Sequence, residues 1–185
     1  YYDNEQYYNL NRLSNVVLKD SSFNLKYIYI VINSELLDYY FNKYFNEYEV
    51  KPLHLSKLPI KIISPEQQLP FIAKADIMLS KNKEVQTVKQ QILQLLKSKY
   101  EGITFSKKLQ DWPGLSFKDF LKELDKQKIK LTLPEQSEWM QYFETEKQKA
   151  NTIQQLIDKT DKEIDAMVYQ LYGLTEEEIK VVEDA

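Results

Sequence analysis

The chain has 185 residues, of which 43% are hydrophobic, 29% are charged and three are glycine, with a formal net charge of −3. This composition is typical of a globular chain that buries a core in one domain or two small ones, and it excludes a disordered segment. The absence of Cys excludes disulfides, thiolate zinc sites and a thiol nucleophile, and the single histidine, His54, excludes multi-histidine metal sites.

The sequence also bears on location. No apolar run approaches the ~18 residues that a membrane-spanning helix needs, and the first residues lack the basic and apolar regions of a signal peptide. We therefore expect a cytoplasmic protein with no membrane partner. The first residue is Tyr1 and not methionine, so we expect a fragment of a longer protein.

The charge is distributed unevenly along the chain. Residues 51–110 contain 11 Lys and four acidic residues, a net charge of +7, whereas residues 111–185 have a net charge of −7. A polyanion would be attracted to the first stretch and repelled by the second. Of the 25 basic residues only Arg12 is an arginine, so it alone can make the bidentate contact that recognises guanine. Lysines of this kind can also be an ordinary solvated surface, an alternative that charge leaves open.

The first 63 residues predict a small lobe of helices and short strands. A β-like run occupies residues 15–18, and apolar residues recur at helical spacing from Asn24 to Ile32. Ser34 can cap a second helix. A loop over residues 52–59 and a short strand over residues 58–63 would complete an α+β lobe. The second helix carries four rings that we assign to core packing, namely Tyr40, Phe41, Tyr44 and Phe45.

Two long helices follow and are expected to pair. The first begins at Pro65 and runs to about Tyr100. Its apolar positions are Ile72, Ala75, Leu79, Val85, Val88, Ile92 and Leu95, with a break of phase and a kink or change of face expected at residues 82–83. The second begins at Pro134, has the alternating three- and four-residue steps of a coiled-coil seam, and ends at Gly173. The ten seam positions are Trp139, Phe143, Glu146, Ala150, Ile153, Ile157, Thr160, Ile164, Met167 and Leu171.

Together these patterns predict a mainly α fold with a small α+β lobe attached to a long antiparallel helical hairpin. The lobe occupies residues 1–63 and the first spacer helix residues 64–100. A small helical insert follows over residues 101–133, in which Ser116 and Asp119 resemble a capping box. The second long helix takes residues 134–173, and a helix capped by Thr175 and Glu178 takes residues 174–185. Since the long helices can pair within one chain, we expect a monomer.

Catalytic chemistry has little support in the residues. Three glycines leave no phosphate-cradling loop. A Mg²⁺-dependent nuclease needs two acids beside a lysine, and the nearest pattern is Asp38 with Glu49 and Lys51. Asp38 falls on an expected helix instead of a hairpin, so the nuclease is kept only as an alternative. We expect no catalytic residue, no metal and no cofactor in this chain.

A polar stretch at residues 51–57 is the candidate contact with DNA. Its side chains offer several hydrogen-bond donors close together, which suits phosphate oxygens. The alternative for His54 is a loop histidine bonded to the backbone. The full candidate set for DNA binding is Arg12, Lys43, Lys51, His54, Ser56, Lys57 and Lys61.

Three stretches resemble restriction–modification proteins. Residues 23–34, followed by Leu36 and by Tyr-Tyr-Phe at residues 39–41, resemble the helix of DNA target-recognition domains. Residues 55–68, with Leu-Pro-Ile at positions 58–60, resemble the strand and helix that close such a domain. Residues 164–179 resemble the carboxyl terminus of large type IIG restriction–methylation enzymes. The TaqI-like C-terminal specificity domain and the specificity subunits of type I systems are relatives by architecture.

The resemblance implies a bacterial target-recognition region with its helical spacer. The recognition lobe would read double-stranded DNA, and the paired helices would fix its distance from adenine methyltransferase and nuclease domains upstream in the same parent chain. Those upstream domains would use S-adenosylmethionine and Mg²⁺. The expected function is therefore a non-catalytic DNA-recognition and spacer module. The alternative is a coiled-coil protein–protein scaffold without a DNA role, whose seam pairs between chains.

Overall fold

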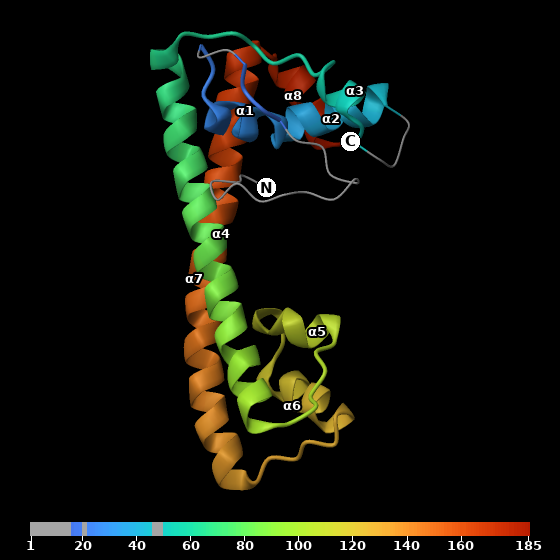
Figure 1. The fold of residues 1–185 in the computed structure, drawn as a ribbon, viewed down its shortest axis with the longest axis vertical. Coiled ribbons are helices and arrows are strands. Elements are labelled where there is room, and N and C mark those ends of the chain that lie inside the picture. Colours follow the sequence, from blue (N-terminus) through green and yellow to red (C-terminus); the bar gives the residue numbers. More distant parts are fainter. Residues whose placement is uncertain (1–15, 20–21, 46–49) are drawn as a thin grey trace. The chain divides into compact units, whose positions relative to one another are not determined.

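The computed structural model describes residues 16–19, 22–45 and 50–185, and within these ranges the chain is helical (Figure 1). None of the described residues forms a strand, so the prediction of a small α+β lobe is wrong. In the same ranges no helix has the length and apolar character that crossing a membrane requires. The elements are α1 (Leu25–Ile32), α2 (Glu35–Tyr44), α3 (Pro52–Leu55), α4 (Pro65–Lys99), α5 (Lys107–Gln110), the 3-10 turn η1 (Trp112–Gly114), α6 (Phe117–Lys126), α7 (Leu133–Tyr172) and α8 (Glu176–Glu183).

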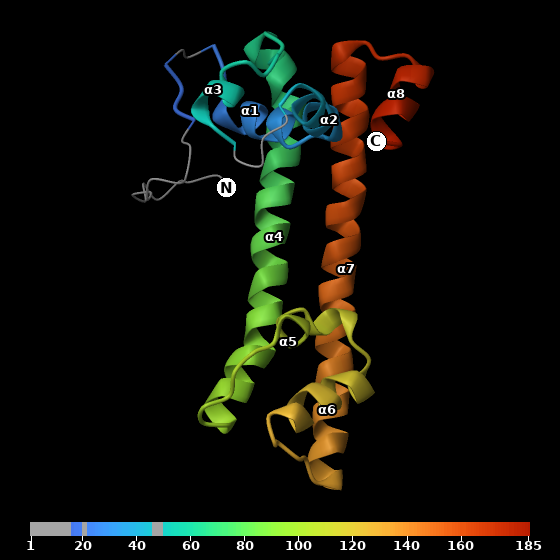
Figure 2. The ribbon, with the colours of Figure 1, turned by 90° about the vertical axis from the view of Figure 1, so that its right-hand side faces the viewer.

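The chain divides into two compact units, and the division falls inside both long helices. Unit 1 consists of Tyr1–Leu79 and Lys159–Ala185, and unit 2 consists of Ser80–Asp158. Within each unit the segments of α4 and α7 run antiparallel (Figure 2). In unit 1 the Lys74 ammonium lies 2.5 Å from the Glu163 carboxylate, and in unit 2 Lys99 and Glu135 are paired at 2.8 Å. The predicted long antiparallel helices are therefore confirmed within each unit.

One hydrophobic core joins four helices in unit 1. The side chains of α1 and α2 that face it pack against the first half of α4 and the last part of α7. Gln68 of α4 is 1% exposed, and its carboxamide accepts a hydrogen bond from the backbone N–H of Asn24, the N-cap of α1. Neither pair of helices can therefore bury its apolar face without the other. The buried core residues are Tyr27, Ile30, Val31, Leu37, Phe71, Ala75, Ile164 and Val168.

The segment predicted as a strand over residues 58–63 has no regular secondary structure and pairs with no strand among the described residues. The backbone N–H of Lys61 donates to the Tyr172 hydroxyl at 3.2 Å, and the Lys61 carbonyl accepts from the Tyr27 hydroxyl at 2.7 Å. The Tyr172 hydroxyl donates in turn to the carbonyl of Pro59 at 2.6 Å. Because two tyrosines satisfy these backbone groups, the segment needs no neighbouring strand. Residues 16–18 are also not a strand, and the expected loop at residues 52–59 contains the one-turn helix α3.

The predicted seam of α7 is confirmed, since all ten of its positions are buried or half-buried. Thr160 is the most buried polar residue in it, at 2% exposure. The prediction for α4 fails at one position, because Leu95 is 45% exposed and its neighbour Leu96 is fully buried. The last buried apolar residue of α4 is therefore Leu96, one position further along the chain than the pattern predicts.

Three of the predicted helix ends are confirmed, whereas Ser34 occupies the N-cap position of α2 but its side chain makes no capping hydrogen bond. The Ser116 hydroxyl accepts from the Asp119 backbone N–H at 3.1 Å, which opens α6. Thr175 and Glu178 form a reciprocal capping box that opens α8. After α7, Gly173 adopts a φ of +75°, a left-handed conformation that favours glycine.

Unit 2 is organised around a group of aromatic rings. Phe143 of α7 contacts Trp112 of η1 and Phe120 of α6, with ring centroids 5.3 and 4.9 Å away. The Trp112 indole N–H donates to the carbonyl of Lys89 in α4 at 3.0 Å, and the ring is fully buried. The insert between the long helices is thereby anchored to both of them.

The tyrosine bridges of unit 1 lead to a testable prediction. Burial, and secondarily the charge of Tyr172, raises the pKa of Tyr27 to about 12, so its hydroxyl is a protonated donor at neutral pH. Replacing Tyr27 with Phe removes the bond to the Lys61 carbonyl and should destabilise the chain by about 1 kcal/mol in urea unfolding. Tyr44→Phe is the matched control because Tyr44 is 70% exposed, and it should leave the midpoint unchanged. Equal midpoints for both variants would contradict the bridging role.

Candidate nucleic-acid interface

The candidate DNA contacts gather where α3 packs on the end of α2. Pro52 occupies the first position of α3, where its missing N–H costs nothing. The imidazole of His54 stacks on Phe45, with ring centroids 4.6 Å apart, and meets the edge of Phe41 at 5.8 Å. His54 is only 6% exposed, and its Nδ1 accepts the backbone N–H of Lys51 at 3.3 Å. His54 therefore fixes α3 against α2, in line with the backbone-bonded alternative, and its ring does not face solvent.

Four of the candidates have exposed side chains at this end of α2. Lys43 lies in the last turn of α2, and Lys51 and Lys57 flank the one-turn helix α3. The Ser56 hydroxyl donates to the carbonyl of Leu53 at 2.8 Å, so it forms a hydrogen bond to the backbone at the end of α3. The structure therefore brings the lysines to α3 and the adjoining end of α2, and their charges suit phosphate groups.

Lys61 has a structural partner instead. Its ammonium donates to the carbonyl of Leu171 at 2.6 Å and lies 6.0 Å from the ring centroid of Tyr172. These groups are at the carboxyl end of α7, where a positive charge is favoured by the helix dipole. The Lys61 ammonium therefore ties the segment over residues 58–63 to α7.

Two predicted residues lie outside the described residues, namely Arg12 and Glu49, the latter from the nuclease alternative. Asp38 of that alternative is exposed on α2 and accepts a hydrogen bond from the Asn42 carboxamide at 3.1 Å. Over the described parts of the chain, no three acidic or histidine side chains come close enough together to hold a metal ion.

Sequence reasoning missed the surface position of one ring. Tyr44 was assigned to the core, but it is 70% exposed and stacks on Tyr40 with ring centroids 4.4 Å apart. The core assignment is therefore wrong for Tyr44. The missed signal is the spacing of Tyr40 and Tyr44, which places both rings on one face of the helix beside Lys43.

The beginning of α2 has the opposite electrostatic character. A groove there is formed with α7 and α8 and contains the carboxylates of Glu35, Asp165 and Glu183. The Tyr169 hydroxyl donates to Glu35 at 2.8 Å, and the Glu35 backbone N–H donates to Asp165 at 2.9 Å. Burial, together with the neighbouring charges of Asp161, Glu35 and Glu183, raises the pKa of Asp165. The groove is also lined by Lys162, and its three carboxylates against one ammonium give it a negative charge that disfavours a polyanion. Helix α2 therefore has an acidic beginning and a basic end.

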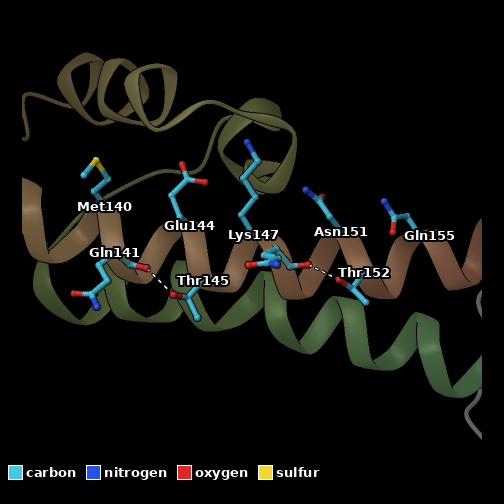
Figure 3. Close-up of a pocket in the computed structure, with 9 residues that line it drawn as sticks. Met140, Gln141, Glu144, Thr145, Lys147, Asn151, Thr152 and Gln155 are labelled. Atoms are coloured by element: carbon cyan, nitrogen blue, oxygen red, sulfur yellow. Dashed lines mark hydrogen bonds between the residues drawn. The ribbon is translucent and has the colours of Figure 1, made fainter.

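A second groove runs along α7 in unit 2, and Figure 3 shows its side chains projecting in a row from that helix. The hydroxyls of Thr145 and Thr152 bond back to the carbonyls of Gln141 and Gln148 on the same helix. Lys147 donates to the carbonyl of Leu115 at 2.5 Å, which uses its charge within the unit. The groove offers mainly amides and hydroxyls, so its chemistry is that of a polar helix surface. Its lining residues are Met140, Gln141, Glu144, Thr145, Lys147, Gln148, Asn151, Thr152 and Gln155.

Comparisons with known proteins bear on both parts of the chain. Residues 1–60 match the model of the TaqI-like C-terminal specificity domain. This match supports a TaqI-like recognition region and suggests a DNA-recognition module of a restriction–modification enzyme. Neither the curated proteins nor the solved structures give a match. Residues 64–168 match the family model described as a domain of unknown function, DUF8810, which covers more than half of the sequence. By this match the chain belongs to the DUF8810 family.

Proposed function

We propose that the chain is the DNA sequence-recognition and spacer module of a bacterial type IIG restriction–methylation enzyme, and that it performs no catalysis itself. The recognition region occupies the first 60 residues, and the long helices act as the spacer. The parent enzyme would carry its adenine methyltransferase and nuclease domains upstream, and these would bind S-adenosylmethionine and Mg²⁺.

The observation that carries this proposal is the match of residues 1–60 to the TaqI-like specificity domain. The described residues of this region share the core of unit 1 with α4 and α7. Tyr27 illustrates the junction, because its ring meets Phe71 of α4 edge-on at 5.4 Å while its hydroxyl bonds Lys61. A recognition region anchored in this way moves together with the adjoining segments of α4 and α7. A spacer that holds the region at a fixed distance needs such a rigid connection.

Charge supports a defined direction of DNA approach. The exposed lysines around α3 would hold phosphates and set the register, while base reading falls to few side chains, with Arg12 the candidate for guanine. The acidic groove at the beginning of α2 disfavours DNA on that side. DNA is therefore expected to approach the α3 side of unit 1.

The alternative of a scaffold that pairs between chains has weaker support. In unit 1 the seam residue Ile164 shares a core with Phe71 and Ala75 of the same chain, and the seam residues Met167 and Leu171 pack against that core. The apolar seam there is already filled within the chain, so we propose a monomer. Size-exclusion chromatography with light scattering would report this directly, and a stable dimer would favour the scaffold.

The DNA-binding role predicts a measurable salt dependence. The chain should bind a ~20-bp duplex with a log–log salt slope of about −3 to −4, since each phosphate contact contributes about −0.9 and four basic candidates remain (Lys43, Lys51, Lys57 and Arg12). Replacing Lys43, Lys51 and Lys57 with Ala should remove about three contacts and flatten the slope accordingly. Fluorescence anisotropy at about 50 and 200 mM salt measures both quantities.

The control for this experiment removes the same charge from unit 2. A Lys97→Ala, Lys118→Ala and Lys130→Ala variant changes three exposed lysines there and should keep most of the slope. Equal losses in the two triple variants would mean that binding follows net charge only. Absence of binding at 50 mM salt by the unmodified chain would count against the DNA-binding role itself.

Lys61 provides a prediction that separates structure from DNA contact. Lys61→Met removes the ammonium that bonds the end of α7 but keeps a long apolar side chain. We expect it to destabilise the chain by about 0.5–1 kcal/mol in urea unfolding, because a charge at a helix carboxyl end contributes about that much. The DNA salt slope should stay within error of the unmodified chain. A slope flattened by about one contact, with stability unchanged, would instead place Lys61 at a phosphate.

A further inference from the structure

The aromatic residues of α2 lie on several faces of the helix, and the fold uses only some of them. Leu37 enters the core of unit 1, where it is 2% exposed. Phe41 and Phe45 pack on His54 and hold α3 in place. Neither Tyr40 nor Tyr44 belongs to the residues that pack against that core. Tyr44 is 70% exposed and Tyr40 is half-buried, so most of the Tyr44 ring and part of the Tyr40 ring remain accessible at the surface.

These two tyrosines form an ordered surface together with a lysine. Tyr40 and Tyr44 are one helical turn apart and stack with ring centroids 4.4 Å apart and planes inclined by 27°. Lys43 is the neighbouring exposed residue, and its ammonium lies 5.4 Å from the ring centroid of Tyr39, one turn earlier. Two pairs of side chains with four-residue spacing thus lie side by side on α2. Tyr40 and Tyr44 are a pair of rings, and Tyr39 and Lys43 are a ring and a cation.

Single exposed apolar side chains are common on protein surfaces, whereas a stacked pair with a cation beside it is more informative. The rings offer an apolar surface and hydroxyl groups, and the ammonium offers a charge for an anion. A partner that matches both must carry negative charge next to flat or apolar groups. The phosphates, sugars and bases of DNA have this arrangement.

We propose that Tyr40, Lys43 and Tyr44 form a DNA-contacting surface, in which the rings pack against sugar and base atoms of the duplex while the ammonium holds a phosphate. This inference rests on the proposed function and names residues for it. The surface is continuous with the candidate interface, because the packing of His54 holds α3 and its lysines at the same end of α2. It also lies in the segment that matches the TaqI-like specificity domain.

The two kinds of contact are separable by their salt dependence. A phosphate contact releases counterions, so its loss changes the log–log slope by about 0.9. A ring contact releases none, so its loss weakens binding by the same factor at every salt concentration. Tyr44→Ala in the full 185-residue chain should therefore bind the ~20-bp duplex about fivefold more weakly at both 50 and 200 mM salt, with an unchanged slope. Lys43→Ala should instead flatten the slope by about one contact.

Matched variants guard this test against loss of structure. Tyr44 is 70% exposed, so its truncation should leave the circular dichroism spectrum unchanged, and Tyr44→Phe should keep the ring contact and most of the affinity. Tyr100→Ala is the control from unit 2, because Lys99 lies 5.6 Å from the Tyr100 ring in a similar arrangement. It should bind as the unmodified chain does.

The outcomes distinguish the inference from the function on which it rests. If the unmodified chain binds and the triple lysine variant is weakened, but Tyr44→Ala binds normally, the ring contact is overturned and the function stands. If Tyr44→Ala flattens the slope as Lys43→Ala does, the ring acts only by placing the lysine, and the contact is again overturned. If the unmodified chain does not bind DNA at all, both the function and the inference fail.

Discussion

The fold of unit 1 depends on one shared hydrophobic core. Tyr27 and Val31 of α1 are fully buried, and they pack with Phe71 of α4 and Val168 of α7, which lie far from them in the sequence. A pair of short helices of this size would not be stable alone in water, and the ends of the long helices would expose an apolar stripe. Each part therefore folds against the other. The matches to two family models, at residues 1–60 and 64–168, describe sequence segments that contribute to a single core.

The same core determines where charge can be displayed. Burial of Leu37 fixes which face of α2 points inward, and the sequence places Glu35 at the beginning of the helix and Lys43 in its last turn. This order agrees with the helix dipole, which favours acids at the amino end and bases at the carboxyl end. The same arrangement of charges thus stabilises the helix and directs an approaching polyanion to the end that carries Lys43. The buried ring of His54 extends the basic end by holding Lys51, the N-cap residue of α3, next to it.

The elements that sequence predicts best are those that depend on local rules. The seam of α7 follows from helical periodicity, and the capping box at Thr175 follows from hydrogen bonding within one turn. The strand expected at residues 58–63 fails because its backbone partners, Tyr27 and Tyr172, are about 34 and 111 residues away from Lys61. No local pattern predicts such partners. For the candidate site, the pattern finds the exposed lysines, but burial decides the roles of His54 and Tyr44, and burial is a property of the assembled core.

The position of the tyrosines follows from the same reasoning. A helix of ten residues with four aromatic rings, followed directly by Phe45, cannot turn all of these rings toward one core, since only about a third of its surface faces inward. Phe41 and Phe45 pack on α3, because a phenylalanine has no hydroxyl to keep in contact with water. Tyr40 and Tyr44 can remain at the surface, since each has an apolar body and a polar tip, which is the combination favoured where a protein meets a partly polar partner. The choice of Tyr over Phe along α2 therefore separates the rings that fold the unit from the rings available to a ligand.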